Sequence, residues 1–304
     1  MKTKNLFIPF LILAFHPFVL KGASIDERVN EVLSPISNTV AGLVFYSLNI
    51  GDFSFPLVLG WLIIASLFCT FYFGFINIKG FGTALKFLTN KKDENNAPGE
   101  VSHRQALWTA TAATVGLGNI AGVAIAVSLG GPGATFWMIL AGFFGMSLKF
   151  CECTLGVKYR VINSDGSVSG GPMYYLSKGL KEIGMQKFGK FLAIMFSICC
   201  IGGALGGGNM FQANQSYQQF VNITGGEQSY FYKNAWLYGL ILAIILGAVI
   251  IGGIKSIAKV TEKLVPLMAA IYIICALIII FLNFQMIGNA FKLIFVGAFT
   301  GEGI

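Results

Sequence analysis

The chain has 304 residues, of which 55% are hydrophobic and only 11% are charged, and its mean hydropathy is +0.73. Soluble domains carry about 25% charged residues, so this composition excludes a soluble globular protein and indicates an all-α integral membrane protein with several spans. The net charge of +8 does not indicate nucleic-acid binding, because the basic residues lie in loops between apolar runs, where they report topology.

The first 23 residues have a basic start and then an apolar run over residues 5–20. This pattern favours a signal-peptide-like segment, with a permanent anchor as the alternative, although Lys21 fits a cleavage site poorly. Residues 24–54 place apolar side chains at helical spacing, which predicts an amphipathic segment on the outer membrane surface. The remaining residues, 55–304, form the membrane domain.

Six apolar runs in this domain predict membrane-spanning helices at residues 55–78, 105–129, 134–157, 191–221, 235–254 and 264–284. The loops after the first, third and fifth runs contain five, six and three Lys or Arg residues, whereas the outer segments contain only Lys21, Arg28 and Lys233. By the positive-inside rule the three basic loops are cytoplasmic. We therefore expect a multi-pass protein of the plasma membrane, here a bacterial inner membrane, whose second span enters from the cytoplasm after an N-cap at Ser102.

The second span has an unusual centre, because residues 116–122 contain three glycines and Asn119. Glycine costs a helix interior about 1 kcal/mol relative to alanine, so the sequence predicts a break there. Backbone groups freed by a break at membrane depth cannot face lipid and must line a protein-walled cavity. Unwound carbonyls, Thr114 and Asn119 suit a hard cation, and free amides near Asn119 suit a carboxylate. Helix packing through Gly118 and Gly122 is the alternative interpretation.

A second glycine-rich cluster lies in the fourth span, over residues 202–208, and is followed by several neutral amides. The glycine spacing predicts that another helix, plausibly the broken one, packs closely there. Asn209, Gln212, Gln215 and Ser216 share one helical face, which indicates either a cavity wall or an outer vestibule. Gln212 is the best candidate for contact with a substrate.

Other motifs carry less information about function. Lys149 and Glu152 are three residues apart and predict an ion pair on one helix face. The six cysteines lie in apolar runs without a CxxC pair or a neighbouring histidine cluster, which argues against a metal site or a disulfide framework. Paired carboxylates, a nucleophile with a base and a P-loop are all missing from the sequence, so we do not expect an enzyme or an organic cofactor.

Residues 113–124 (ATVGLGNIAGVA) and 130–138 (GGPGATFWM) closely resemble the alanine or glycine:cation symporter family. Residues 170–175 (GGPMYY), 208–212 (GNMFQ) and 252–258 (GGIKSIA) resemble it too, so that the resemblance runs in order from about Phe55 to Ile304. Leu117 stands where the family has threonine, a departure that would alter the size of the pocket.

The resemblance implies a LeuT-like fold of the APC superfamily, with two inverted repeats, and sodium-coupled uptake of alanine or glycine. Ala112 and Val115 would offer carbonyls to Na⁺, Gly116, Gly118 and Asn119 would hold the substrate carboxylate, and Thr114 and Gln212 would line the pocket. One preceding helix and the first inverted repeat account for residues 55–304, so the second repeat is expected to be missing, and this part of the transporter domain should not transport alone.

Two other functions stay open at this stage. A cation channel would also use glycine-rich breaks, and a membrane scaffold subunit would use the glycines for packing alone. The sequence does not distinguish alanine from glycine as the substrate. The lack of a carboxylate within the membrane near the break favours Na⁺ over H⁺ as the coupling ion.

Overall fold

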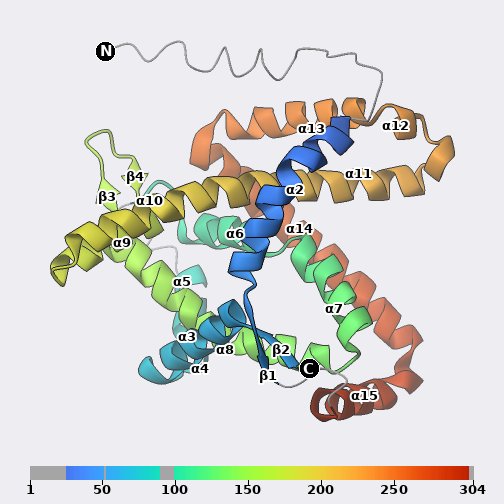
Figure 1. Cartoon of the computed structure of the whole chain (residues 1–304), viewed down its shortest axis with the longest axis horizontal. Coiled ribbons are helices and arrows are strands. Elements are labelled where there is room, and N and C mark those ends of the chain that lie inside the picture. Colours follow the sequence, from blue (N-terminus) through green and yellow to red (C-terminus); the bar gives the residue numbers. More distant parts are fainter. Residues whose placement is uncertain (1–24, 51–52, 90–98, 301–304) are drawn as a thin grey trace. The chain divides into compact units, whose positions relative to one another are not determined.

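The computed structural model describes residues 25–50, 53–89 and 99–300 (Figure 1). The signal-like segment at residues 1–23 lies outside the described residues. The chain divides into two units, residues 1–64 and 65–304. Helices make up most of the described residues in each unit, and the strands found there belong to two short antiparallel hairpins that the sequence analysis did not predict.

The first unit contains helix α2 (Ile25–Val44), which confirms the helical character predicted for this segment. It is followed by the hairpin of β1 (Ser47–Ile50) and β2 (Phe53–Pro56), with Ser47 opposite Pro56. Polar and apolar residues alternate along both strands, a period of two that favours extended backbone. Because Phe55 belongs to β2, the predicted first span begins later, at Leu57 of helix α3 (Leu57–Tyr72).

Three of the predicted spans are helices long and apolar enough to cross a membrane. They are α8 (Ala134–Lys158), the composite helix Gln186–Ile223 and α14 (Gly253–Leu282). Two pairs of helices meet the same length and apolarity only together and are bent between their halves: α3 with Ile76–Leu88, which covers α4 (Ile76–Lys79) and most of α5 (Phe81–Thr89), and α6 (His103–Thr114) with Gly118–Gly130. The first pair bends by 61° within the span predicted at residues 55–78, and the sequence analysis did not predict this break.

The predicted boundary between the fifth and sixth spans was wrong. Helix α13 (Ala235–Ile250) has 16 residues and measures about 24 Å, less than the roughly 30 Å of a bilayer core. Gly253 has a φ of +66°, which ends one helix and starts α14. The lysines that we placed in a loop therefore lie on α14. Lys255, Lys259 and Lys263 recur every four residues on an exposed face, where long side chains reach polar surroundings.

The composite helix joins α10 (Gln186–Gly203), a π-helical turn (Ala204–Met210) and α11 (Phe211–Ile223). Figure 1 shows α10 and α11 as one long yellow rod. The predicted close helix packing at its glycines is not found: a Cβ built on Gly202, Gly203, Gly206 or Gly207 meets no atom of the described chain within 4 Å. Gly206, Gly207 and Gly208 instead lie within the π-helical turn, and Gly202 and Gly203 end α10 directly before it.

The loop after α8 contains the hairpin of β3 (Val161–Ile162) and β4 (Val168–Ser169). Its turn lies at residues 163–166, with Gly166 at a φ of +79°. The Ser167 hydroxyl and amide both donate to Asp165 and lower the pKa of this carboxyl. Helix α9 (Pro172–Glu182) then packs on α10 at Gly189, where a Cβ would lie 2.6 Å from the Leu176 carbonyl oxygen.

The short helices between α11 and α13 are a 3₁₀ turn (Gly226–Gln228) and α12 (Tyr230–Lys233). After α14, a 3₁₀ turn (Phe284–Met286) leads into α15 (Ile287–Phe299), which crosses the start of α8 closely. A Cβ on Gly133 would lie 2.3 Å from the Gly297 carbonyl carbon, and Trp137 Nε1 donates to Ala298 O at 3.1 Å. This crossing requires glycine at position 133.

We predict that Gly133→Ala destabilises the protein, because the added methyl group overlaps backbone atoms that cannot rotate away. Overpacking of this kind costs about 1–3 kcal/mol, measurable as a lower Tm in detergent. Gly142→Ala, within α8, is the control, since its Cβ meets no described atom within 4 Å. Equal Tm values for the two variants would contradict the close crossing of α8 and α15.

Candidate functional site

The break predicted at the glycines of the second span is present. Ser102 caps α6, as predicted, by accepting from Gln105 N, and α6 ends at Thr114. Val115 is extended, with φ −87° and ψ 102°, and the chain resumes as a π-helical turn (Gly118–Gly122) and then α7 (Val123–Gly130). The two halves are bent by 52°. Backbone groups of residues 112–117 are therefore released from regular helical pairing.

Two carbonyls at the break lose the amides that a continuous helix would give them. Gly116 N would bond to Ala112 O, but it donates to Asn119 Oδ1 at 3.2 Å. Asn119 N would bond to Val115 O, but it donates to Gly116 O at 3.1 Å. These are the two carbonyls that the family resemblance assigns to Na⁺.

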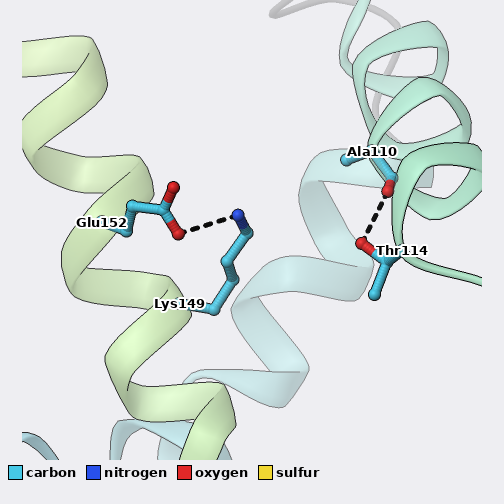
Figure 2. A network of polar contacts seen from close by, with 4 residues as sticks. All are labelled: Ala110, Thr114, Lys149 and Glu152. Atoms are coloured by element: carbon cyan, nitrogen blue, oxygen red, sulfur yellow. Dashed lines mark hydrogen bonds and ion pairs between the residues drawn. The ribbon is translucent and has the colours of Figure 1, made fainter. Parts of the chain in front are cut away.

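The side chains of Asn119 and Thr114 already make local contacts. Asn119 uses its amide oxygen to close the break, which leaves its Nδ2 group as a donor. The Thr114 hydroxyl donates to Ala110 O at 2.8 Å, within its own helix (Figure 2). That bond uses the hydroxyl hydrogen and leaves oxygen lone pairs, so Thr114 can still accept a hydrogen bond or ligate a cation.

Gln212, near the start of α11, joins the two glycine-rich segments. Its Oε1 accepts from Leu117 N at 3.4 Å, and its Nε2 would lie 3.5 Å from a Cβ on Gly116. The second cluster thus approaches the break through an amide side chain rather than through its glycines. Gly118 and Gly122 likewise meet no described atom within 4 Å, so the packing interpretation is not supported in this chain.

An open groove of about 570 Å³ runs from the break along α11. Its wall contains three of the predicted amide-face residues, whereas Asn209 is not part of it. The lining residues are Leu117, Gln212, Gln215, Ser216, Gln219, Phe220, Ile223 and Tyr238. Gln219 was missed, although its spacing of four from Gln215 would have placed it on the same face. Tyr238 comes from α13 and bonds to Ser216 at 2.6 Å, a contact without a sequence signal.

The lower half of the broken helix is attached to α14 by polar contacts that the sequence analysis also missed. Gln105 Nε2 donates to Glu262 Oε2 at 3.1 Å, and the Thr109 and Thr261 hydroxyls are 3.0 Å apart. Gln105 therefore bonds in two directions: its Oε1 accepts from Ser102 N at the start of α6, and its Nε2 donates to Glu262 of α14. These contacts fix α6 below the break.

The predicted pair of Lys149 and Glu152 is confirmed, with Nζ and Oε2 2.8 Å apart on α8 (Figure 2). The Lys149 side chain is 58% exposed and the Glu152 side chain 44% exposed in this chain, so their ion pair contributes little to stability. It lies on a different helix from the break and is not part of the groove.

The apolar helices, together with a helix broken at carbonyls and amides, define a multi-pass membrane protein of the transporter class. Comparison with known families then identifies it more closely. Residues 44–304 match the sodium:alanine symporter family, and the chain belongs to that family. This is a family of transporters rather than enzymes, and its name gives Na⁺ as the coupling ion.

Several curated relatives are carriers of amino acids. The chain is 43% identical over 263 residues to the sodium/alanine symporter AgcS of Methanococcus maripaludis, covering 86% of this chain and 54% of the relative. It is 34% identical to the amino-acid carrier protein AlsT of Bacillus subtilis, over 76% of this chain and 46% of AlsT. It is also 34% identical to the probable sodium/glutamine symporter GlnT of B. subtilis, covering 77% and 45%. The chain thus spans about half the length of these relatives.

We predict that Gln212→Ala loosens the break, because Leu117 N loses its acceptor. A typical hydrogen bond contributes about 0.5–1.5 kcal/mol, so hydrogen exchange at Leu117 should accelerate by about 2- to 10-fold. Gln215→Ala is the matched control, since Gln215 lines the same groove without bonding to Leu117. Unchanged exchange in Gln212→Ala, or equal acceleration in both variants, would contradict this role.

Proposed function

We propose that this chain is the N-terminal part of a sodium-coupled symporter that brings alanine or glycine into the cell. Its membrane domain, residues 55–304, would be the first inverted repeat of a LeuT-like fold with one preceding helix, and residues 24–54 would lie on the outer surface of the plasma membrane. The observation that carries the proposal is the broken helix within a family of sodium:alanine symporters.

The missing second repeat belongs to the same proposal. The chain covers about half of its relatives' length, and only 6% of the most apolar window of each long span is buried within it. Such apolar faces need lipid or further protein against them. A second repeat would supply the other wall of the groove and of the site at the break.

In the proposed site, Na⁺ binds the carbonyls of Ala112 and Val115, which lack their usual helical partners. The substrate carboxylate accepts hydrogen bonds from the backbone at Gly116 and Gly118 and from the Nδ2 group of Asn119, while Thr114 and Gln212 line the pocket. Sodium places positive charge beside the carboxylate and orders the break. Each ligand therefore strengthens the binding of the other, and alternating access would follow from rocking of one helical bundle against the rest.

We predict that uptake of alanine by the protein from the complete reading frame requires Na⁺ and falls at least about 10-fold in Asn119→Ala. Loss of a hydrogen bond to a charged group, about 1.5–3 kcal/mol, sets that magnitude. Asn222→Ala, an exposed asparagine at the far end of α11, is the control. Uptake would be measured with radiolabelled alanine, glycine and glutamine in vesicles, with Na⁺ replaced by choline.

Equal uptake without Na⁺, or full activity in Asn119→Ala, would refute the proposed mechanism. The same vesicles distinguish the two rival functions. A channel would pass Na⁺ current without substrate, and a scaffold subunit would bind no amino acid.

A further inference from the structure

A second break, which the symporter site does not use, lies between α3 and α4. The two segments are bent by 61°, and both Gly74 and Phe75 adopt left-handed backbone, with φ of +57° and +61°. A phenylalanine in this region is unusual and needs support from its surroundings. The break packs against residues 143–150 in the middle of the apolar helix α8, as the contact of the Phe73 and Phe150 rings shows.

Side chains on both sides of this break reach successive carbonyls of α8. Before it, the Thr70 hydroxyl lies 2.8 Å from Ser66 O and 3.4 Å from Phe144 O. After it, Asn77 Nδ2 donates to Phe143 O at 3.1 Å. Thr70 is fully buried. Thr70 and Asn77 thus bond to the stretch of α8 that also contains the buried Ser147.

Two oxygen atoms in this cluster are buried and lack a hydrogen-bond partner in the described chain: Asn77 Oδ1 and Ser147 Oγ. Ser147 is 0% exposed. It follows Phe143 by one helical turn, so it lies on the same face of α8 as the carbonyl that Asn77 uses, and its hydroxyl does not bond to that carbonyl. A second repeat could cover outer surfaces, but it could not reach atoms already enclosed by α3, α4 and α8.

We propose that one ordered water binds between α4 and α8, donating to Asn77 Oδ1 and accepting from the Ser147 hydroxyl. Buried waters make two to four hydrogen bonds to otherwise unpaired polar groups, and these two atoms supply one acceptor and one donor. A hard metal ion fits less well, because such ions take six or more oxygen ligands. The water completes a polar joint that holds the span before the repeat on α8.

The sign of the effect of Ser147→Ala tests this site. With the water in place, the variant deprives it of a partner and lowers the Tm in detergent by about 2 °C or more. In a dry interior the same variant removes an unpaired buried hydroxyl and leaves the Tm unchanged or higher, which would overturn the proposal. Ser197→Ala is the control, because that hydroxyl bonds within its own helix to Ala193 O at 2.8 Å.

Two further measurements separate the remaining outcomes. If Na⁺, rather than water, occupied the joint, the Tm increase in NaCl over choline chloride would be smaller in Ser147→Ala than in the unsubstituted protein, which would also overturn the proposal; an unchanged increase supports water. An experimental structure of the unsubstituted protein, at a resolution that shows waters, should contain one within hydrogen-bond distance of both atoms. Its absence there would refute the site even if Ser147→Ala does not fold.

Discussion

The structure depends on one constraint: backbone groups released inside a membrane must be paired by protein. The chain interrupts two spans and pairs the freed groups in two different ways. At the break after Thr114, amide side chains close the gap, with Asn119 on one side and Gln212 from α11 on the other. At the break after Tyr72, backbone turn bonds such as Gly74 N to Phe71 O and Phe75 N to Thr70 O pair the freed groups, and the Thr70 and Asn77 side chains bond to carbonyls of the neighbouring helix α8. The first arrangement leaves carbonyls open to a ligand, and the second encloses its polar atoms.

Sequence analysis predicted the first break and missed the second for a physical reason. Residues 116–122 combine three glycines with an asparagine, a composition that disfavours helix and offers a local amide partner. Residues 73–76 are Phe-Gly-Phe-Ile, which fit an apolar span, and the break there is accompanied by packing of Phe73 on Phe150 and by bonds of Thr70 and Asn77 to α8. Breaks encoded by local composition are predictable, whereas breaks imposed by a tertiary partner are not.

The glycines show the same limit. Their spacing in the fourth span predicted a close helix crossing at residues 202–208, but crossings without room for a Cβ are at Gly133, in the turn before α8, and at Gly189, near the start of α10. Glycine spacing along a helix indicates where another helix could pack closely, but it does not show that one packs there. In the same way, the amide face of α11 was predictable from periodicity, while Tyr238 and Glu262 come from other helices and reach the site only through the fold.

The two halves of the broken helix are held by different neighbours, so the bend between them depends on how those neighbours are positioned. Gln105 and Thr109 attach the lower half to α14, whereas the upper half runs through the tight turn at Gly131–Gly133 directly into α8, which is itself fixed against α15 at Gly133. A displacement of α14 relative to α8 must therefore change the bend at residues 115–117. Those residues carry the carbonyls and amides of the candidate site, so ligand binding and the relative position of the two helices depend on each other.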